Sequence, residues 1–511
     1  MSTSQNPNEA PKTSAAVADP YALSPDRIEE PPTSLGGKLR HLGPGFILSA
    51  SIVGSGELIA TTVLGAQAGF ICFWVVIVSC LVKVTLQLEF GKHAIQSGES
   101  TFASFNKLPG PKIGHANWST WGWFVLMLLK FLQVGGIVGG VAIILQLIKP
   151  ITTPGAVAGS AGADLPVVWT ILVAISVSLL VFRGYYKFIE KASIVMIGLF
   201  TLLTLASVCA LQTTDYAIGF AEIASGFTFQ LPSEGWILIA AIGAFGITGV
   251  GGDEIMTYNY WLLEKGYAAK TGPRDDSEAW TRRAKGWINV MYWDAIVSMV
   301  VYTVVTAAFY ILGAAVLHAK AMDEADKMVE AGEITREQVT DKEVLAELIP
   351  ANSDLVGTLG NIYTETLGPW AQNVFLAGAF IVLFSTLFAA LAGWTRLYSD
   401  CFGRMGAYDF DDPVKRRKWV AGLAWAIPAL WAFAYLFVGF VFGNSPATMV
   451  FIGGVATSVI LLIVVVAAMH FRYRRLPESL RPGRVYDVFL WLSATVIVGA
   501  AIYALVVKLI S

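Results

Sequence analysis

Two stretches of seven residues, 197 positions apart, resemble each other: Val53-Gly-Ser-Gly-Glu-Leu-Ile59 and Val250-Gly-Gly-Asp-Glu-Ile-Met256. Each interrupts an apolar run that is otherwise long enough to cross a bilayer, which takes about 20 residues. Glycines interrupt the helical hydrogen bonds and leave backbone groups unpaired. At membrane depth such backbone survives only inside the protein or beside a watery cavity. Matched breaks in the two halves of a membrane protein therefore indicate a transport site.

The composition is that of a membrane protein. Hydrophobic residues make up 55% of the 511 residues, charged residues only 14%, and the mean hydropathy is +0.62, whereas soluble proteins carry about 25% charged residues. Eleven apolar runs lie near 45–68, 70–90, 119–148, 166–182, 188–211, 235–262, 287–317, 367–395, 418–441, 446–470 and 486–508. We predict an all-α membrane protein with about eleven transmembrane helices, of which helices 1 and 6 are broken.

The two breaks open two units of five spans each. Because five is an odd number, the second unit enters the membrane from the opposite side, which makes an inverted repeat. The domain prediction is a disordered cytoplasmic tail over 1–40, a first repeat over 41–211 and a second over 212–470. A cytoplasmic linker and the eleventh helix complete it over 471–511.

The basic residues orient the chain. With the N-terminus in the cytoplasm, 27 of the 35 Lys and Arg residues fall on the inner side and 6 on the outer side, as the positive-inside rule requires. The outer loop 318–354 holds ten acidic and four basic residues. An ordinary solvated loop is the favoured interpretation over a vestibule that concentrates cations. A bacterial inner membrane or a plasma membrane is the default location.

Several functional classes lack their sequence signals. The net charge of −2 excludes a basic nucleic-acid binder. Four scattered cysteines give neither a zinc site nor a disulfide framework. Neither an HExxH motif nor a phosphate-binding P-loop is present, so we expect neither an enzyme nor an ATP-driven pump. A sensor would need a signalling domain, for which a tail of about 40 residues is too short. We expect no cofactor, and no obligate protein partner is evident.

The breaks carry the chemistry of a metal-ion site. Glu57, Asp253 and Glu254 place three carboxylates at membrane depth, where an ionisable residue is a functional candidate by default. Carbonyls freed at the breaks would add oxygen ligands, so the predicted metal set also includes Gly54, Gly251 and Gly252. Carboxylate and carbonyl oxygens suit hard cations such as Mg²⁺, Ca²⁺ or Mn²⁺. The predicted partners are a divalent cation as substrate and the lipid bilayer.

The surrounding residues resemble the Nramp metal-transporter family. Gly43-Pro-Gly-Phe46 before the first break and Gly65-Ala-Gln-Ala-Gly-Phe70 after it are similar to the family's opening. Gly184-Tyr185, with Glu190 six residues after the glycine, is similar to its junction of spans 4 and 5. The resemblance runs from about residue 40 to residue 470. It implies a LeuT-like fold with the substrate at the breaks of spans 1 and 6.

This sequence also departs from the family pattern. Where transition-metal members have Asp-Pro-Gly-Asn in span 1, it has Gly54-Ser-Gly-Glu57, and where they have Met-Pro-His in span 6, it has Gly252-Asp-Glu254. Lys130 and Gln133 stand at the places of two span 3 carboxylates in the family's proton path. The resulting set resembles the Nramp-related magnesium transporters. That resemblance implies a wide acidic cavity without a thioether ligand and without a proton relay.

Other span residues are weaker candidates for the pathway. Gln67 and Thr61 are polar contacts near the first break. Lys130 either replaces a coupling proton with a fixed charge or forms a structural ion pair, which is favoured, and Asp294 and Glu89 are its candidate partners.

The preferred hypothesis is a secondary transporter of Mg²⁺, with Mn²⁺ as a second substrate, that works by alternating access without proton coupling. One alternative is a proton-coupled Mn²⁺ or Fe²⁺ transporter of the Nramp type. Another is an amine or amino-acid symporter of the same fold.

Overall fold

The computed structural model describes residues 19–54, 56–151, 165–183, 186–349, 369–443 and 446–510. Ser55 of the first break, Gly184 and Tyr185 of the family-like junction, and residues 1–18 of the predicted tail lie outside the described residues. So does the end of the acidic loop from residue 350.

The first unit of five spans follows the predicted order. It consists of α2 (Pro44–Ile52) with η2 (Gly56–Thr61) and α3 (Thr62–Ala68), then α4 (Phe73–Ser97), α6 (Trp118–Ile148), α7 (Val167–Val181) and α8 (Tyr186–Leu211). The second unit consists of α10 (Gly235–Ile247) with α11 (Gly252–Lys265), then α13 (Glu278–Leu312), α17 (Pro369–Arg404), α18 (Pro413–Phe442) and α19 (Pro446–His470), followed by α20 (Arg484–Ile510).

The remaining elements are short and connect these helices. They are η1 (Pro25–Arg27), α1 (Leu35–Leu39), α5 (Thr101–Phe105), α9 (Phe220–Ser225), α12 (Tyr267–Thr271), η3 (Gly313–His318), α14 (Ala319–Glu330), η4 (Gln338–Thr340), α15 (Lys342–Leu348), η5 (Phe471–Arg475) and η6 (Glu478–Leu480). A two-stranded antiparallel sheet joins β1 (Lys112–Ile113) to β2 (Ala116–Asn117), with Lys112 opposite Asn117.

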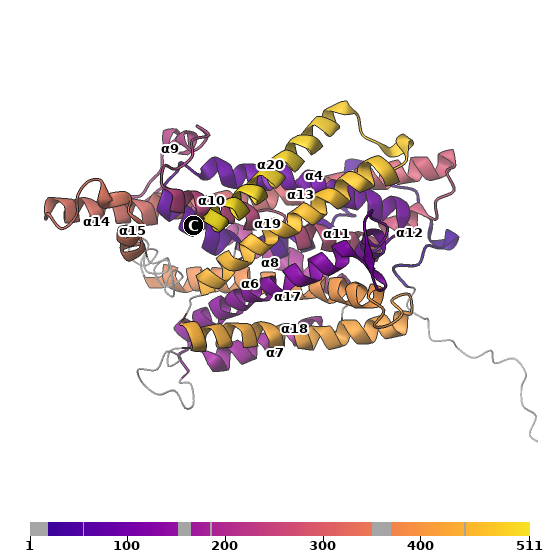
Figure 1. The fold of residues 1–511 in the computed structure, drawn as a ribbon, viewed down its shortest axis with the longest axis horizontal. Helices are drawn as coiled ribbons and strands as arrows, with labels where there is room; N and C mark the ends of the chain where they lie inside the picture. The colour runs from indigo at the N-terminus through magenta and orange to yellow at the C-terminus, as the bar shows by residue number, and fades with distance from the viewer. Residues whose placement is uncertain are drawn as a thin grey trace, which may run out of the picture.

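The long helices lie side by side in one bundle (Figure 1). Within the described residues, nine helices are long and apolar enough to cross a membrane, the bent pair of α2 and α3 makes a tenth, and the shorter α7 is also apolar. In Figure 1, α9, α14 and α15 gather at one end of the bundle and α12 lies at the other. The predicted all-α membrane fold is confirmed.

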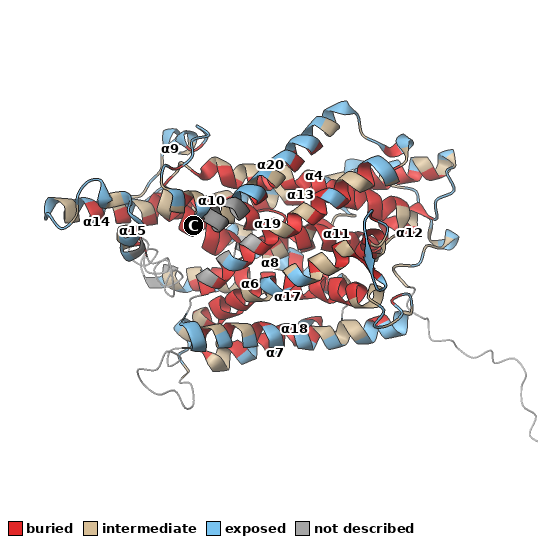
Figure 2. Ribbon diagram, viewed as in Figure 1, coloured by how far each residue is buried: buried red, intermediate tan, exposed pale blue. Residues whose placement is uncertain are grey.

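Burial separates a core from a periphery (Figure 2). In the core, α6 packs against α17, α18 and α19, and α13 packs against α2 and α4. On the peripheral helices α18 and α20, large apolar side chains are exposed; Phe433 is 62% exposed and Val488 is 66% exposed. Monomeric soluble proteins rarely expose so many large apolar side chains together, and a lipid bilayer is the environment that suits these faces.

Both predicted helix breaks are present. The first span stops at Ile52 and resumes at Gly56 as a π-helical turn, and its two parts are bent by 45°. The sixth span stops at Ile247 and resumes at Gly252, with residues 248–251 outside any helix. Within this second break Gly249 has φ +67°, a conformation that side chains other than glycine rarely adopt.

The structure corrects the prediction of a disordered tail for residues 19–40. The Tyr21 hydroxyl donates to Glu264 (2.8 Å), and the indole N–H of Trp287 donates to the carbonyl of Glu29 (3.0 Å). Asp19 also forms an ion pair with Arg416. Average composition is a poor guide here, because a few aromatic and charged anchors fix a segment that is otherwise rich in proline.

Candidate functional site

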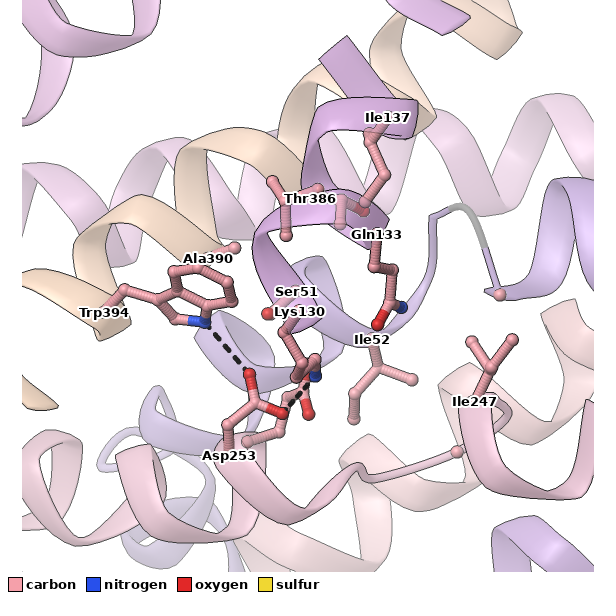
Figure 3. Close-up of a pocket in the computed structure, with 14 residues that line it drawn as sticks. Ser51, Ile52, Lys130, Gln133, Ile137, Ile247, Asp253, Thr386, Ala390 and Trp394 are labelled. Atoms are coloured by element: carbon pink, nitrogen blue, oxygen red, sulfur yellow. Dashed lines mark hydrogen bonds and ion pairs between the residues drawn. The ribbon is translucent and has the colours of Figure 1, made fainter. Parts of the chain in front are cut away.

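A small cavity lies between the two helix breaks (Figure 3). Its volume is about 30 Å³, which is room for one or two water molecules and not for a fully hydrated ion. It is lined by Ser51, Ile52, Gly56, Lys130, Gln133, Val134, Ile137, Ile247, Gly249, Asp253, Glu254, Thr386, Ala390 and Trp394. These residues come from both breaks and from α6 and α17, so four spans meet at this point.

Asp253 is the most heavily bonded carboxylate of the cavity. It lies in the first turn of α11 and is 2% exposed. One carboxylate oxygen forms an ion pair with Lys130, and the other accepts the indole N–H of Trp394 at 3.0 Å (Figure 3). The helix N-terminus also favours a negative charge at this position. Asp253 on α11 is thus held by side chains from two other spans, α6 and α17.

Glu254 offers a free ligand oxygen. Its Oε2 is buried and has no hydrogen-bond partner among the described residues. A buried carboxylate oxygen without a partner is costly, which suits an atom whose partner is a transported ion. Gly251 leaves the space for it, because a Cβ at that position would stand 2.2 Å from Glu254 Oε2.

Glu57 lies beside the cavity and is not among its lining residues. Its side chain is fully buried, and its Oε2 accepts the backbone N–H of Gly54 at 3.0 Å. The hydroxyl of Thr306 on α13 is 3.5 Å from the other oxygen. Gly56, next to Glu57 in sequence, does line the cavity. Glu57 therefore stabilises the backbone of the first break through Gly54, without lining the cavity.

The three predicted glycines are positions of close packing. A Cβ at Gly54 would stand 1.8 Å from Thr386 Oγ1, and one at Gly252 would stand 2.6 Å from Ile460 Cγ2. Neither of these glycines nor Gly251 is among the lining residues. Among the described residues, no group of three histidine, cysteine, aspartate or glutamate side chains is placed to hold a metal ion. Of the six residues predicted to bind the metal ion, only Asp253 and Glu254 line the cavity in this conformation.

Lys130 and Gln133 face the cavity from α6, one turn apart. Both are buried, and Gln133 Oε1 has no hydrogen-bond partner among the described residues. The ion pair with Asp253 corrects the candidate partners of Lys130, which were Asp294 and Glu89. Glu89 pairs instead with Lys92 at 2.5 Å.

Asp294 holds the start of the first span. Its two oxygens accept the backbone N–H groups of Gly43 (2.8 Å) and Gly45 (2.6 Å), and Oδ2 also accepts the hydroxyl of Tyr258 (2.8 Å). The free N–H groups at a helix N-terminus need such a partner. Asp294 therefore ties the start of α2 to α13 and to Tyr258 on α11, at a distance from the cavity lining.

The two remaining pathway candidates lie away from the cavity lining as well. The hydroxyl of Thr61 donates to the carbonyl of Glu57 at 2.5 Å, within the π-helical turn. Gln67 lies in α3, and its Oε1 is buried without a partner among the described residues.

Sequence reasoning missed most of the cavity lining, including Trp394, Thr386 and Gly249. Trp394 and Thr386 on α17 lie inside an apolar run, where nothing distinguishes them from ordinary core residues. Gly249 could not be distinguished in the sequence from Gly251 and Gly252, which lie close to it. Lys83 on α4 is a further buried charge close to the second break, where its Nζ lies 2.8 Å from the carbonyl of Thr248.

Comparisons with known proteins identify relatives. A family model described as natural resistance-associated macrophage protein-like, or Nramp, matches residues 45–507. An uncharacterized protein of Pasteurella multocida (strain Pm70) is 23% identical over 364 residues, which cover 70% of each chain.

Solved transporter structures resemble this chain as well. MhsT in complex with L-phenylalanine has a TM-score of 0.51 at 17% identity, over 94% of this chain and 99% of MhsT. Mhp1, a nucleobase-cation-symport-1 family transporter, also scores 0.51 at 17% identity, over 91% and 90%. A manganese transporter of Eremococcus coleocola scores 0.44 at 15% identity, over 95% and 99%. The first two likenesses confirm the LeuT-like fold.

Proposed function

The chain belongs to the Nramp family, and from this premise we propose that it is a secondary transporter of divalent cations. Mg²⁺ is the main substrate in this proposal and Mn²⁺ a second one. The ion passes through the cavity between the two helix breaks by alternating access, and its movement is not coupled to protons.

The chemistry of the cavity lining carries the proposal. Its charged and polar side-chain groups are the carboxylates of Asp253 and Glu254, the amide of Gln133, two hydroxyls, the Lys130 ammonium and the Trp394 N–H. No thioether, thiol or imidazole is among the described lining residues. Oxygen ligands alone favour Mg²⁺, Ca²⁺ and Mn²⁺ over softer metals. Since the cavity has room for one or two waters, the ion enters it largely stripped of water or with the helices moved apart.

In the proposed transport cycle, Lys130 is the counter-ion of Asp253 whenever no cation is bound. Before an ion arrives, its ammonium neutralises Asp253 in a region where an unpaired charge is very costly. An incoming divalent cation competes for the same carboxylate and displaces the ammonium. The lysine thereby keeps the site closed and stable between two transport events, without a proton.

The membrane potential is the driving force in this proposal. Each elementary charge gains about 2.3 kcal/mol per 100 mV, so a divalent cation gains about 4.6 kcal/mol on entering a negative compartment. None of the five histidines is among the cavity lining residues, so the lining holds no imidazole to carry a proton inward.

A second candidate function rests on Glu254. Its unpartnered Oε2 could accept a proton, and this favours a proton-coupled transporter of Mn²⁺ as the alternative. An amine or amino-acid symporter has no such observation in its favour, since the cavity is too small for either substrate.

The test is uptake into reconstituted vesicles under a set membrane potential, with a pH dye inside. We expect Mg²⁺ uptake that follows the potential without acidification. Glu478→Gln serves as a control, because that carboxylate is 91% exposed and is not among the cavity lining residues. Uptake of Mn²⁺ alone with matched acidification would overturn the proposal in favour of the coupled alternative.

A further inference from the structure

Lys83 on α4 occupies an unusual position for a buried lysine. Its side chain is fully buried, and its Nζ donates to the carbonyls of Phe245 (2.5 Å), Gly246 (3.2 Å) and Thr248 (2.8 Å). The hydroxyl of Ser79, one turn earlier on α4, lies within hydrogen-bond distance of two of the same carbonyls, those of Phe245 (2.8 Å) and Thr248 (3.0 Å). The three N–H groups of the ammonium therefore all donate to carbonyls at the end of α10 and in the second break.

This set of carbonyls resembles a monovalent-cation site. The last carbonyls of a helix lack helical partners, and the C-terminal end of the helix carries a partial negative charge. In transporters with broken helices, such half-helix C-termini and unwound carbonyls coordinate Na⁺ or a proton equivalent. Here the same place is filled by a permanent single positive charge on a side chain.

The charge balance of Lys83 supports this interpretation. Among the described residues, no carboxylate lies within ion-pair distance of its ammonium, whereas Lys92 on the same helix contacts Glu89 at 2.5 Å. Lys83 is thus compensated mainly by carbonyl dipoles, as a bound Na⁺ would be. Neither Lys83 nor Ser79 is among the residues that line the cavity, so this place is separate from the divalent-cation site.

We propose that Lys83 is a tethered monovalent cation, whose ammonium fills a site that the carbonyls of Phe245, Gly246 and Thr248 would otherwise offer to Na⁺ or another small cation. The inference deepens the proposed function, on which it rests for its meaning: a transporter with a built-in cation at this place needs no monovalent ion to be carried along. The existence of the latent site can be tested apart from transport.

The first experiment measures the thermal stability of purified Lys83→Ala in detergent. Chloride salts of methylammonium, Na⁺, K⁺ and choline are compared at equal ionic strength. We expect the variant to melt several degrees lower in choline and to recover saturably with methylammonium or Na⁺, while the wild type shows no difference among the salts. Leu86→Ala is the matched control, because Leu86 is a fully buried apolar residue of the same helix. Because this substitution removes an apolar side chain and no charge, we expect no cation to restore its stability.

The second experiment measures divalent-cation uptake by the same proteins. We expect Lys83→Ala to transport at least about tenfold more slowly in choline than in Na⁺ or methylammonium, and wild type and Leu86→Ala to be indifferent to the salt. If wild type transports no divalent cation and Lys83→Ala is still stabilised by Na⁺ or methylammonium, the proposed function fails and the tethered cation stands.

The inference itself is overturned by any of three results. One is a folded Lys83→Ala variant whose stability responds to no cation. Another is a saturable stabilisation of the wild type by Na⁺. The third is a Lys83→Ala variant that cannot be purified in any of the salts although Lys83→Arg can, because Lys83 is then a structural cap.

Purification of Lys83→Ala only with methylammonium or Na⁺ present throughout would support the inference.

Discussion

At the scale of single residues, five ionisable side chains lie in the two helix breaks or against them, and three of the five line the cavity. Glu57, Asp253 and Glu254 contribute three carboxylates, and Lys83 and Lys130 contribute two ammonium groups, so that the formal net charge is −1. One ammonium holds a carboxylate and the other holds backbone carbonyls. This arrangement keeps an empty site close to neutral while leaving an excess of oxygen ligands for a cation.

Asp253→Asn tests the central carboxylate. The amide oxygen can still accept the Trp394 N–H, but the charge that attracts a cation is gone and Lys130 loses its counter-ion. We expect divalent-cation uptake at saturating potential to fall at least tenfold, with a folded protein. Uptake by purified protein in vesicles measures this, and a folded variant that transports at the wild-type rate would show that the site is misplaced.

Lys130→Met tests the competition between the ammonium and the ion. Removing one partner of a buried ion pair costs about 3–5 kcal/mol because the other charge stays buried and unpaired. The variant should therefore unfold at a lower temperature in the absence of divalent cations. Since the net charge of the site becomes −2, Mg²⁺ should raise its melting temperature more than that of the wild type. Equal shifts in the two proteins would contradict the displacement of Lys130 by the ion.

At the scale of the elements, the two breaks are shaped by close approach as much as by glycine flexibility. Gly249 combines φ +67° with a place where a Cβ would lie 2.9 Å from Cys80 Cα. The second break can therefore lie directly against α4, which brings Lys83 within reach of its carbonyls.

Gly249→Ala should destabilise the fold. The left-handed conformation costs about 1–2 kcal/mol for a residue with a Cβ, and the contact with Cys80 adds a displacement of backbone. Gly422→Ala on α18 is the control, because a Cβ there meets no atom within 4 Å. Thermal unfolding in detergent should show a clear loss for the first variant and little change for the second. An unaffected melting temperature in Gly249→Ala would contradict the described break.

Glu99, between α4 and α5, gives the stability of the protein a pH dependence. Burial alone would raise the pKa of Glu99, but hydrogen bonds from His93 and Lys107 outweigh it and lower that pKa to about 2. Arg475 of η5 also donates to this carboxylate at 3.1 Å. A carboxyl group with a lowered pKa stabilises the fold above its ordinary pKa of 4.5 and loses that effect as the pH falls toward 2.

We therefore expect wild-type stability to decline between about pH 4.5 and pH 2 more steeply than that of Glu99→Gln. Melting temperatures of both proteins across this range measure the difference. The two proteins should differ most above pH 5, where the wild type keeps the whole contribution. Parallel curves at all pH values would contradict the role of Glu99.

The sequence predicted the elements well for a physical reason. In a chain with few charges, Glu57, Asp253 and Glu254 stand out at once, and so do the glycines that interrupt their spans. The partners of these groups could not be predicted, because Lys130 lies 123 residues from Asp253 and Trp394 lies 141 residues from it. Such contacts depend on how helices pack, and an apolar run does not specify which face meets which neighbour.

At the scale of the whole molecule, the apolar faces and the charged ends agree on one placement in a membrane. The exposed faces of α18 and α20 carry large apolar side chains, whereas α14 and the loop before α20 carry charges. In Figure 1, α14 and α15 lie at the end of the bundle opposite α12. The distribution of lysine and arginine predicts that the end with α12 faces the cytoplasm.

Cysteine labelling in intact cells tests this orientation. Cys209 is exposed while Cys72, Cys80 and Cys401 are buried, so Cys209→Ala supplies a background without a readily labelled thiol. In that background Glu324→Cys, on α14, should react with a membrane-impermeant maleimide in intact cells. Glu478→Cys, in the loop before α20, should react only after the cells are opened, because its loop is rich in arginine and faces inward. The reverse pattern would place the N-terminus outside, and the potential that draws a cation into the cell would then meet the two helix breaks from the opposite end.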